Sequence, residues 1–140
     1  MSSIKPTGWQ GNKEVDIPSY DGEVYHGYFY NRSHLLAKSL GGAEIIENLV
    51  TGTRMQNVGN THNSGGMAYP ETLAREWLKT HKHGYIYYDA TPVYYGDDLL
   101  CRYVIVDILT SDETIDMRII VFNAANGYAI DYATGRYEAT

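Results

Sequence analysis

The chain has 140 residues, of which 44% are hydrophobic and 20% charged, and its formal net charge is −6. This length and apolar content predict one compact domain over residues 1–140, and they exclude two full-sized domains or a disordered chain. The single cysteine, Cys101, excludes an intramolecular disulfide framework and any multi-cysteine metal site. No apolar run reaches the ~18 residues of a membrane span, and residues 1–6 lack the apolar stretch of a signal peptide.

The first part of the chain is predicted to contain a wrapping segment, a strand and a weak helix. Residues 1–22 are punctuated by Gly and Pro, and we expect them to wrap the body of the domain. Aromatic and apolar residues alternate over 23–30, which predicts a strand. The spacing of apolar residues over 43–57 allows a helix, which Gly52 and two threonines weaken.

A loop and the clearest helix follow. Residues 58–66 are rich in Gly, Asn and Ser, a composition that predicts a loop. Pro70 suits the first turn of a helix, where a backbone N–H would have no partner within the helix. We therefore expect a helix over 70–82 with an apolar face formed by Leu73, Trp77 and Leu78.

The last part of the chain predicts strands. A tyrosine-rich run over 85–88, with a continuation over 90–95, indicates the first of them. Residues 102–109 and 115–122 flank a turn and predict a hairpin, and 128–132 predicts a short last strand. The elements together predict an α+β fold, with helices in the middle and an antiparallel meander at the C-terminal end.

The net charge, taken alone, argues against a nucleic-acid-binding protein, which usually presents a basic surface. The charge is, however, unevenly distributed. Residues 1–23 carry a net −2 and residues 84–140 a net −6, whereas residues 24–83 carry six basic and four acidic side chains, a net +2. The middle segment is therefore where we expect an anionic ligand, although chance and an acidic solvated sheet would produce the same pattern.

Polar residues suited to catalysis lie in this middle segment. Arg32 and His34 follow the first predicted strand, where a histidine beside a cation can act as a general base near a bound anion. Asn48 and Asn57 come next, and Glu71 begins the clearest helix. Each residue type also has an ordinary structural role: a structural histidine, a turn or cap asparagine, a glutamate at a helix dipole.

Four stretches taken together resemble a known family. They are residues 30–36 (YNRSHLL), 40–42 (LGG), 48–57 (NLVTGTRMQN) and 66–71 (GMAYPE). In order and spacing they are similar to the DNA/RNA non-specific endonucleases of the ββα-metal, or His-Me finger, superfamily, and within it to the branch of secreted streptococcal DNases and DNA-entry nucleases. The resemblance extends from about residue 8 to the C-terminus. It implies a ββα-metal fold with a central antiparallel sheet and a few helices.

The resemblance implies a role for each of these polar residues. His34 would be the general base that deprotonates a water for in-line attack on a phosphodiester, and Arg32 would contact the phosphate. Asn57 would be the direct protein ligand of one divalent cation, Mg²⁺ or alternatively Mn²⁺. Glu71 would hold a metal-bound water, and Asn48 would orient the site through hydrogen bonds. The products would carry 5′-phosphates.

The sequence departs from the family at two positions of the histidine motif. The family motif is Asp-Arg-Gly-His, whereas this chain has Asn31 in place of the Asp and Ser33 in place of the Gly. The base and the metal ligand are unchanged by these two differences. The resemblance therefore predicts a complete catalytic set, and the effect of Asn31 on the site is an open question.

The resemblance also implies a substrate and a setting. Arg54, Arg75 and Lys79 are expected to contact substrate phosphates, unless they are exposed solubilising charges. DNA would be the substrate, RNA a further one, with no membrane partner. We expect a secreted or surface-associated protein whose signal peptide is absent from this chain: a secreted DNase, or a toxin domain that an immunity protein inhibits.

A second class of function competes with this one. The 14 tyrosines suit β-strands and wet surfaces, which is typical of a non-catalytic β module that binds glycan or protein. That hypothesis leaves the spacing of His34, Asn57 and Glu71 unexplained. Metal-dependent digestion of DNA distinguishes the two.

Overall fold

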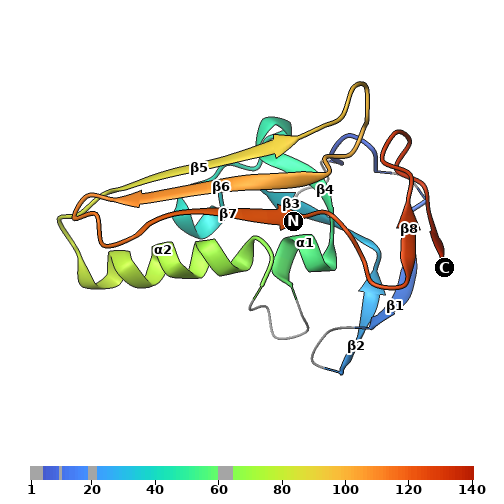
Figure 1. Ribbon diagram of the computed structural model, residues 1–140, viewed down its shortest axis with the longest axis horizontal. Helices are drawn as coiled ribbons and strands as arrows, with labels where there is room; N and C mark the ends of the chain where they lie inside the picture. The colour runs from blue at the N-terminus through green and yellow to red at the C-terminus, as the bar shows by residue number, and fades with distance from the viewer. Residues whose placement is uncertain (1–4, 10, 19–21, 60–64) are drawn as a thin grey trace.

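Three antiparallel strands form the main sheet, in the order β5 (Ile86–Val93), β6 (Tyr103–Thr110) and β7 (Asp116–Phe122) (Figure 1). The computed structural model describes most of the chain, in four ranges: 5–9, 11–18, 22–59 and 65–140. Successive side chains of a strand point to opposite faces, and alternate residues of β6 are accordingly buried in the core: Val104, Val106, Ile108 and Thr110. The predicted strands of this region and their hairpin are confirmed.

The middle segment forms two strands followed directly by a helix. Strand β3 (Tyr30–His34) pairs antiparallel with β4 (Leu49–Thr53), and α1 (Arg54–Val58) begins at the next residue. Two 3-10 turns, η1 (Lys38–Leu40) and η2 (Ile46–Asn48), connect the strands. The Thr53 side chain caps α1, because its oxygen accepts a hydrogen bond from the Gln56 N–H at 3.1 Å.

The helix predicted over 43–57 is wrong for most of its length. Residues 49–53 form the fully buried strand β4, and only 54–58 are helical. Val50, Thr51 and Thr53 are β-branched, which favours a strand, and Gly52 disfavours a helix interior. The apolar spacing that suggests a helix here belongs instead to a strand buried on both faces.

Helix α2 (Ala68–Thr80) lies along one face of the main sheet and packs against β6 (Figure 1). It buries Pro70, Ala74 and Trp77, so the predicted helix is confirmed and begins two residues earlier than expected. The predicted loop over 58–66 falls mostly outside the described residues. No helix in the described part of the chain is long and apolar enough to cross a membrane.

Two small hairpins lie together at one end of the domain (Figure 1). Strand β1 (Glu14–Pro18) pairs with β2 (Val24–Tyr28), and β8 (Tyr128–Ile130) pairs with β9 (Tyr137–Ala139). The strand predicted over 23–30 is therefore divided at Phe29 between β2 and β3. The N-terminal segment, expected only to wrap the domain, contributes the edge strand β1.

Aromatic side chains form the core between these hairpins. The rings of Phe29 and Tyr137 stack with their centroids 3.8 Å apart, and Tyr128 and Tyr30 pack around them at centroid distances of 5.0 Å and 4.9 Å from Phe29. The Tyr30 hydroxyl donates a hydrogen bond to the Gly135 carbonyl at 2.6 Å. Three of the 14 tyrosines therefore serve this aromatic cluster, and six others are exposed on the surface.

A buried asparagine joins the middle segment to the C-terminal half. The Asn123 amide donates to the carbonyls of Thr51 and Cys101 at 3.0 Å, and its oxygen accepts the Thr53 N–H at 3.0 Å. Cys101 itself is fully buried, and burial raises the pKa of its thiol to about 11. Cys101 therefore packs as a small buried residue, because a reactive cysteine needs a lowered pKa and exposure.

Candidate active site

The ββα unit, defined as β3, β4 and α1, positions most of the predicted catalytic residues. Arg32 and His34 lie on β3, and strand alternation directs them to the same side. Asn48 immediately precedes β4, and Asn57 lies in α1. Glu71 comes from the first turn of α2, whose start is tied to α1 by a 2.8 Å hydrogen bond from the Met67 N–H to the Gln56 carbonyl.

Asn48 fixes the backbone just beyond His34. Its side-chain oxygen accepts the Leu36 N–H at 2.9 Å, and its amide donates to the Leu36 carbonyl at 2.9 Å. The same amide donates to the Ala43 carbonyl at 2.9 Å. One side chain thus joins the two ends of the connection between β3 and β4, and the orienting role of Asn48 in the site stays a prediction.

The His34 imidazole faces a carboxylate that the sequence does not single out. Its Nε2 contacts Oε1 of Glu44, and both side chains are partly buried, with exposed fractions of 25% for His34 and 37% for Glu44. Glu44 lies ten residues beyond His34, in the connection between η1 and η2. Glu47 lies in the same stretch and is also exposed, and no sequence pattern separates the two glutamates.

Asn57 and Asn31 lie against each other. The Asn57 amide nitrogen donates to the side-chain oxygen of Asn31 at 3.3 Å. With its nitrogen engaged, Asn57 keeps its amide oxygen as a potential ligand for a cation. The residue that departs from the family motif is therefore in direct contact with the predicted metal ligand.

The Glu71 carboxyl is half-buried, and its environment is unusual for an acid. Burial raises its pKa to about 7, although the Arg75 guanidinium opposes the shift. Arg75 in turn donates to the Ser39 hydroxyl at 3.0 Å, which links α2 to η1. Burial, and after it the charge of Glu71, also raises the pKa of the Tyr88 hydroxyl on β5. Glu71 therefore faces the interior between α2 and the main sheet.

The predicted phosphate-binding cations differ in their surroundings. The Arg32 guanidinium lies 4.9 Å from the centre of the Trp9 ring, and that of Arg54 lies 4.9 Å from the centre of the Tyr25 ring. Lys79 is exposed and pairs with Glu76 at 3.7 Å. Since Lys79 is eight residues beyond Glu71, it lies ~12 Å away along the helix axis. The structure thus brings Arg32, Arg54 and Arg75 to the ββα unit and α2, and leaves Lys79 at the far end of the helix.

Comparison with known sequences identifies the family. The sequence model described as DNA/RNA non-specific endonuclease matches residues 3–111. The chain belongs to this family. A curated relative, a deoxyribonuclease from Streptococcus dysgalactiae subsp. equisimilis, is 40% identical over 124 residues, which cover 89% of this chain and 37% of the relative.

Solved structures of nucleases share the fold of this DNA/RNA non-specific endonuclease family member. The Sda1 nuclease with bound zinc ion is 44% identical, with a TM-score of 0.88 over 92% of this chain and 52% of that one. NucA from Streptococcus agalactiae with magnesium ion bound is 24% identical, with a TM-score of 0.79 over 100% of this chain and 64% of that one. The predicted ββα-metal fold is confirmed. The chain spans about a third to a half of the length of the curated relative and of Sda1.

The donor chemistry of the site in this endonuclease family member fits a hydrated, hard cation. Within the described ranges, no three His, Cys, Asp or Glu side chains are placed to hold a metal ion together. One neutral amide oxygen, that of Asn57, instead suits an ion that keeps several of its waters, as Mg²⁺ does.

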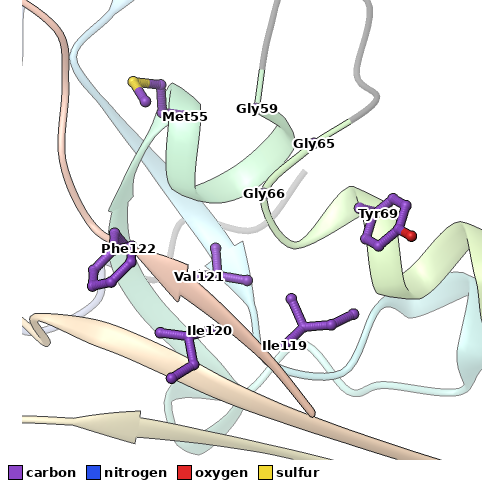
Figure 2. A pocket seen from close by; sticks show the side chains of 9 residues that line it. All are labelled: Met55, Gly59, Gly65, Gly66, Tyr69, Ile119, Ile120, Val121 and Phe122. Atoms are coloured by element: carbon purple, nitrogen blue, oxygen red, sulfur yellow. The ribbon is translucent and has the colours of Figure 1, made fainter. Parts of the chain in front are cut away.

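A cavity beside the site has a different character. A hollow of about 280 Å³ lies between α1, the start of α2 and the edge strand β7. Figure 2 shows the residues that line it. Its described lining is mainly apolar, with Met55, Tyr69 and the β7 side chains Ile120 and Phe122 around it. His34, Asn57 and Glu71 are not among the described residues that line it. This cavity offers apolar contact and holds none of the predicted catalytic groups.

Proposed function

We propose that the chain is the catalytic domain of a metal-dependent endonuclease that hydrolyses phosphodiester bonds of DNA, and of RNA as a further substrate. The observation that carries the proposal is the ββα unit with His34 at the end of β3 and Asn57 in α1, in a chain of this family. The name of the curated relative, a deoxyribonuclease, favours DNA as the main substrate.

Each residue then has a defined task. His34 takes a proton from the attacking water, and Arg32 holds the phosphate and the charge that develops on it. Asn57 would hold the divalent cation through its amide oxygen, and Glu71 would orient a water beside it. When bound, the cation stabilises negative charge on the phosphate and on the leaving oxygen. The 3′ oxygen leaves, so the products carry 5′-phosphates.

Mg²⁺ is the proposed ion, with Mn²⁺ as the alternative. The amide oxygen of Asn57 is a hard oxygen donor, which both ions accept. Isothermal calorimetry with Mg²⁺, Mn²⁺ and Zn²⁺ in turn would rank the three ions on the same protein. Tighter binding and faster digestion with Zn²⁺ than with Mg²⁺ would contradict the assignment.

Plasmid digestion tests the proposed activity. We expect nicking and then degradation of the plasmid with Mg²⁺, no digestion with EDTA, and none by His34→Ala with Mg²⁺. His26→Ala is the matched control, since His26 also pairs with a carboxylate but on the exposed β1–β2 hairpin. Digestion that persists in EDTA, or full activity of His34→Ala, would overturn the mechanism.

The biological setting that the similarities favour is a secreted DNase. The relatives include a protein described as an extracellular endonuclease, with 26% identity and a TM-score of 0.67 over 77% of this chain. A toxin domain is the second candidate, and it requires an immunity protein in the producing cell. A gene for a small inhibitor beside the coding sequence, and binding of its product to this domain, would favour the toxin.

A further inference from the structure

We propose that Glu44 is a positioning residue for His34: its carboxylate holds the imidazole in the orientation and tautomer that leave Nδ1 to accept a proton. The inference rests on the proposed function, in which His34 is the general base. It adds a residue that the sequence motif does not contain.

The contact itself is the first step of the argument. Oε1 of Glu44 meets Nε2 of His34, and the two side chains are only 25% and 37% exposed. The other described histidine–carboxylate pair on a strand, His26 with Asp16, has exposed fractions of 73% and 71%. Partial burial reduces the competition from water, so the His34–Glu44 hydrogen bond orients the ring more strongly than a surface pair does.

The chemistry of imidazole gives the second step. In neutral imidazole, one ring nitrogen carries a hydrogen and donates, while the other has a lone pair and accepts. An ionised carboxylate can only accept, so the His34 nitrogen that meets Glu44 is the one that carries the hydrogen. The lone pair is then on Nδ1, at the opposite side of the ring from Glu44. A general base needs such a free lone pair directed at the water.

The connection between β3 and β4 holds Glu44 in place. Asn48 binds the carbonyl of Ala43, the residue before Glu44, and also both backbone groups of Leu36, two residues beyond His34. A Cβ added at Gly42 would lie 1.8 Å from the Leu36 carbonyl oxygen, so the two arms of the connection are in close contact. The backbone that carries Glu44 is therefore held in place, and its carboxylate stays beside the His34 imidazole.

The negative charge of Glu44 predicts how KM and kcat should respond when this residue is removed. A carboxylate beside the bound phosphate repels the substrate, so its removal should leave KM unchanged or lower it. Loss of ring orientation acts on proton transfer and lowers kcat. A fall in kcat without a rise in KM therefore distinguishes positioning of His34 from binding of substrate.

The test compares Glu44→Ala with Glu47→Ala in the full chain. Both changes remove one exposed or partly exposed acid from the same connection, and only Glu44 contacts His34. We expect kcat of Glu44→Ala to fall ~10–100-fold, by analogy with the loss found when a group that orients a metal-binding histidine is removed. Glu44→Gln should give an intermediate kcat, because its amide can accept from Nε2–H or donate to a bare Nε2. We expect wild-type kinetics from Glu47→Ala.

A spectroscopic measurement reads the tautomer directly. Long-range ¹H–¹⁵N correlation of the neutral His34 ring should show the hydrogen on Nε2 in the wild type and a mixture of tautomers in Glu44→Ala. Thermal unfolding of each variant establishes that it is folded. Wild-type kcat or an unchanged tautomer in Glu44→Ala would overturn the inference, and a raised kcat would mean that Glu44 blocks the base.

Failure of the inference is distinct from failure of the proposed function. If His34→Ala is inactive and Glu44→Ala has wild-type kinetics, His34 is the base and Glu44 does not position it. If His34→Ala is itself fully active, His34 is not the base and the inference falls with the function.

Discussion

Two histidine–carboxylate pairs in this domain show how burial changes the meaning of the same contact. On the β1–β2 hairpin, Nδ1 of His26 lies 2.5 Å from Oδ1 of Asp16, with more than two thirds of each side chain exposed. At the end of β3, His34 and Glu44 make the same kind of contact, but most of each side chain is shielded from solvent. Exposed pairs contribute little to stability or to orientation, whereas a partly buried pair fixes a ring. The comparison predicts that the pair in the ββα unit contributes to catalysis and that the exposed pair does not.

The largest expected difference between the two pairs is in catalysis. We expect His34→Ala to lower kcat ~10²–10⁴-fold, the usual contribution of a general base, while His26→Ala stays within about twofold of the wild type. Initial rates on a fluorogenic double-stranded DNA, at saturating Mg²⁺, measure both. Equal losses of kcat in His34→Ala and His26→Ala would show that the two histidine–carboxylate pairs do not differ in catalysis.

The next difference concerns the asparagines near each pair. Asn57→Ala should abolish the Mg²⁺-induced rise in melting temperature and lower activity ~100-fold or more, because the direct protein ligand is lost. Asn126→Ala is the matched control at the other end of the domain, where Asn126 donates to the Pro18 carbonyl at 3.0 Å. Differential scanning fluorimetry with and without Mg²⁺ checks both variants. A normal Mg²⁺ response in Asn57→Ala would place the cation elsewhere.

A smaller effect is expected on stability at Glu71. Its pKa is raised from 4.5 to about 7, so the folded protein holds this proton over a pH range in which the unfolded chain has released it. Glu71 therefore costs stability as the pH rises from 4.5 to 7. Glu71→Gln should match the wild type at pH 4 and exceed it by about 1–2 kcal/mol above pH 7, a range reduced for solvent screening.

Urea denaturation in EDTA at pH 4, 5.5 and 8 measures this difference. EDTA keeps divalent cations from favouring the ionised carboxyl. The difference in the free energy of unfolding between Glu71→Gln and the wild type should increase with pH. A difference that is constant over the three pH values would show that Glu71 does not cause the pH dependence.

The smallest effect is expected at the exposed pair. Asp16→Asn should change the free energy of unfolding by less than about 0.5 kcal/mol, because solvent screens the charges of Asp16 and His26. Melting curves at low and high salt check it. A loss of unfolding free energy several times larger would show that the exposed fraction does not predict the strength of histidine–carboxylate pairs in this fold.

The histidine motif could be found from sequence because its residues are close in the chain and their types are demanded by the chemistry. The family, the fold class and the main hairpin follow from such local signals, and each is confirmed. Strand β4 was not predictable from the same signals, because a strand buried on both faces and a short apolar helix have similar patterns. Strands β1 and β9 are short and gain their stability from pairing across the fold.

Glu44 could not be predicted for a different reason. Its contact with His34 depends on the path of the connection that Asn48 braces, and Glu47 is an equally acidic neighbour in sequence. Contacts of this kind are set by the conformation of a loop rather than by residue type. The predicted contribution of Lys79 to substrate binding likewise depends on where the helix ends, and it stays a prediction.

The structure also shows where the charged side chains of the domain lie. In the acidic C-terminal part, arginines pair with neighbouring acids: Arg118 with Asp107 at 2.7 Å and Arg102 with Asp98 at 2.9 Å. Four of the six basic side chains of the middle segment lie on β3, α1 and α2. A polyanion is repelled by one part of the domain and attracted to the other, which favours one orientation of approach.

The way in which α1 is anchored matters for anyone who subclones this domain. The helix has only five residues, and its first turn is held by Thr53, whose N–H donates to Asn123 and whose hydroxyl donates to the Ala124 carbonyl. Both acceptors lie beyond residue 111, where the match to the family model ends. A chain that ended at residue 111 would keep His34, Asn57 and Glu71. It would lose Asn123 and Ala124, which hold the first turn of the helix that carries Asn57.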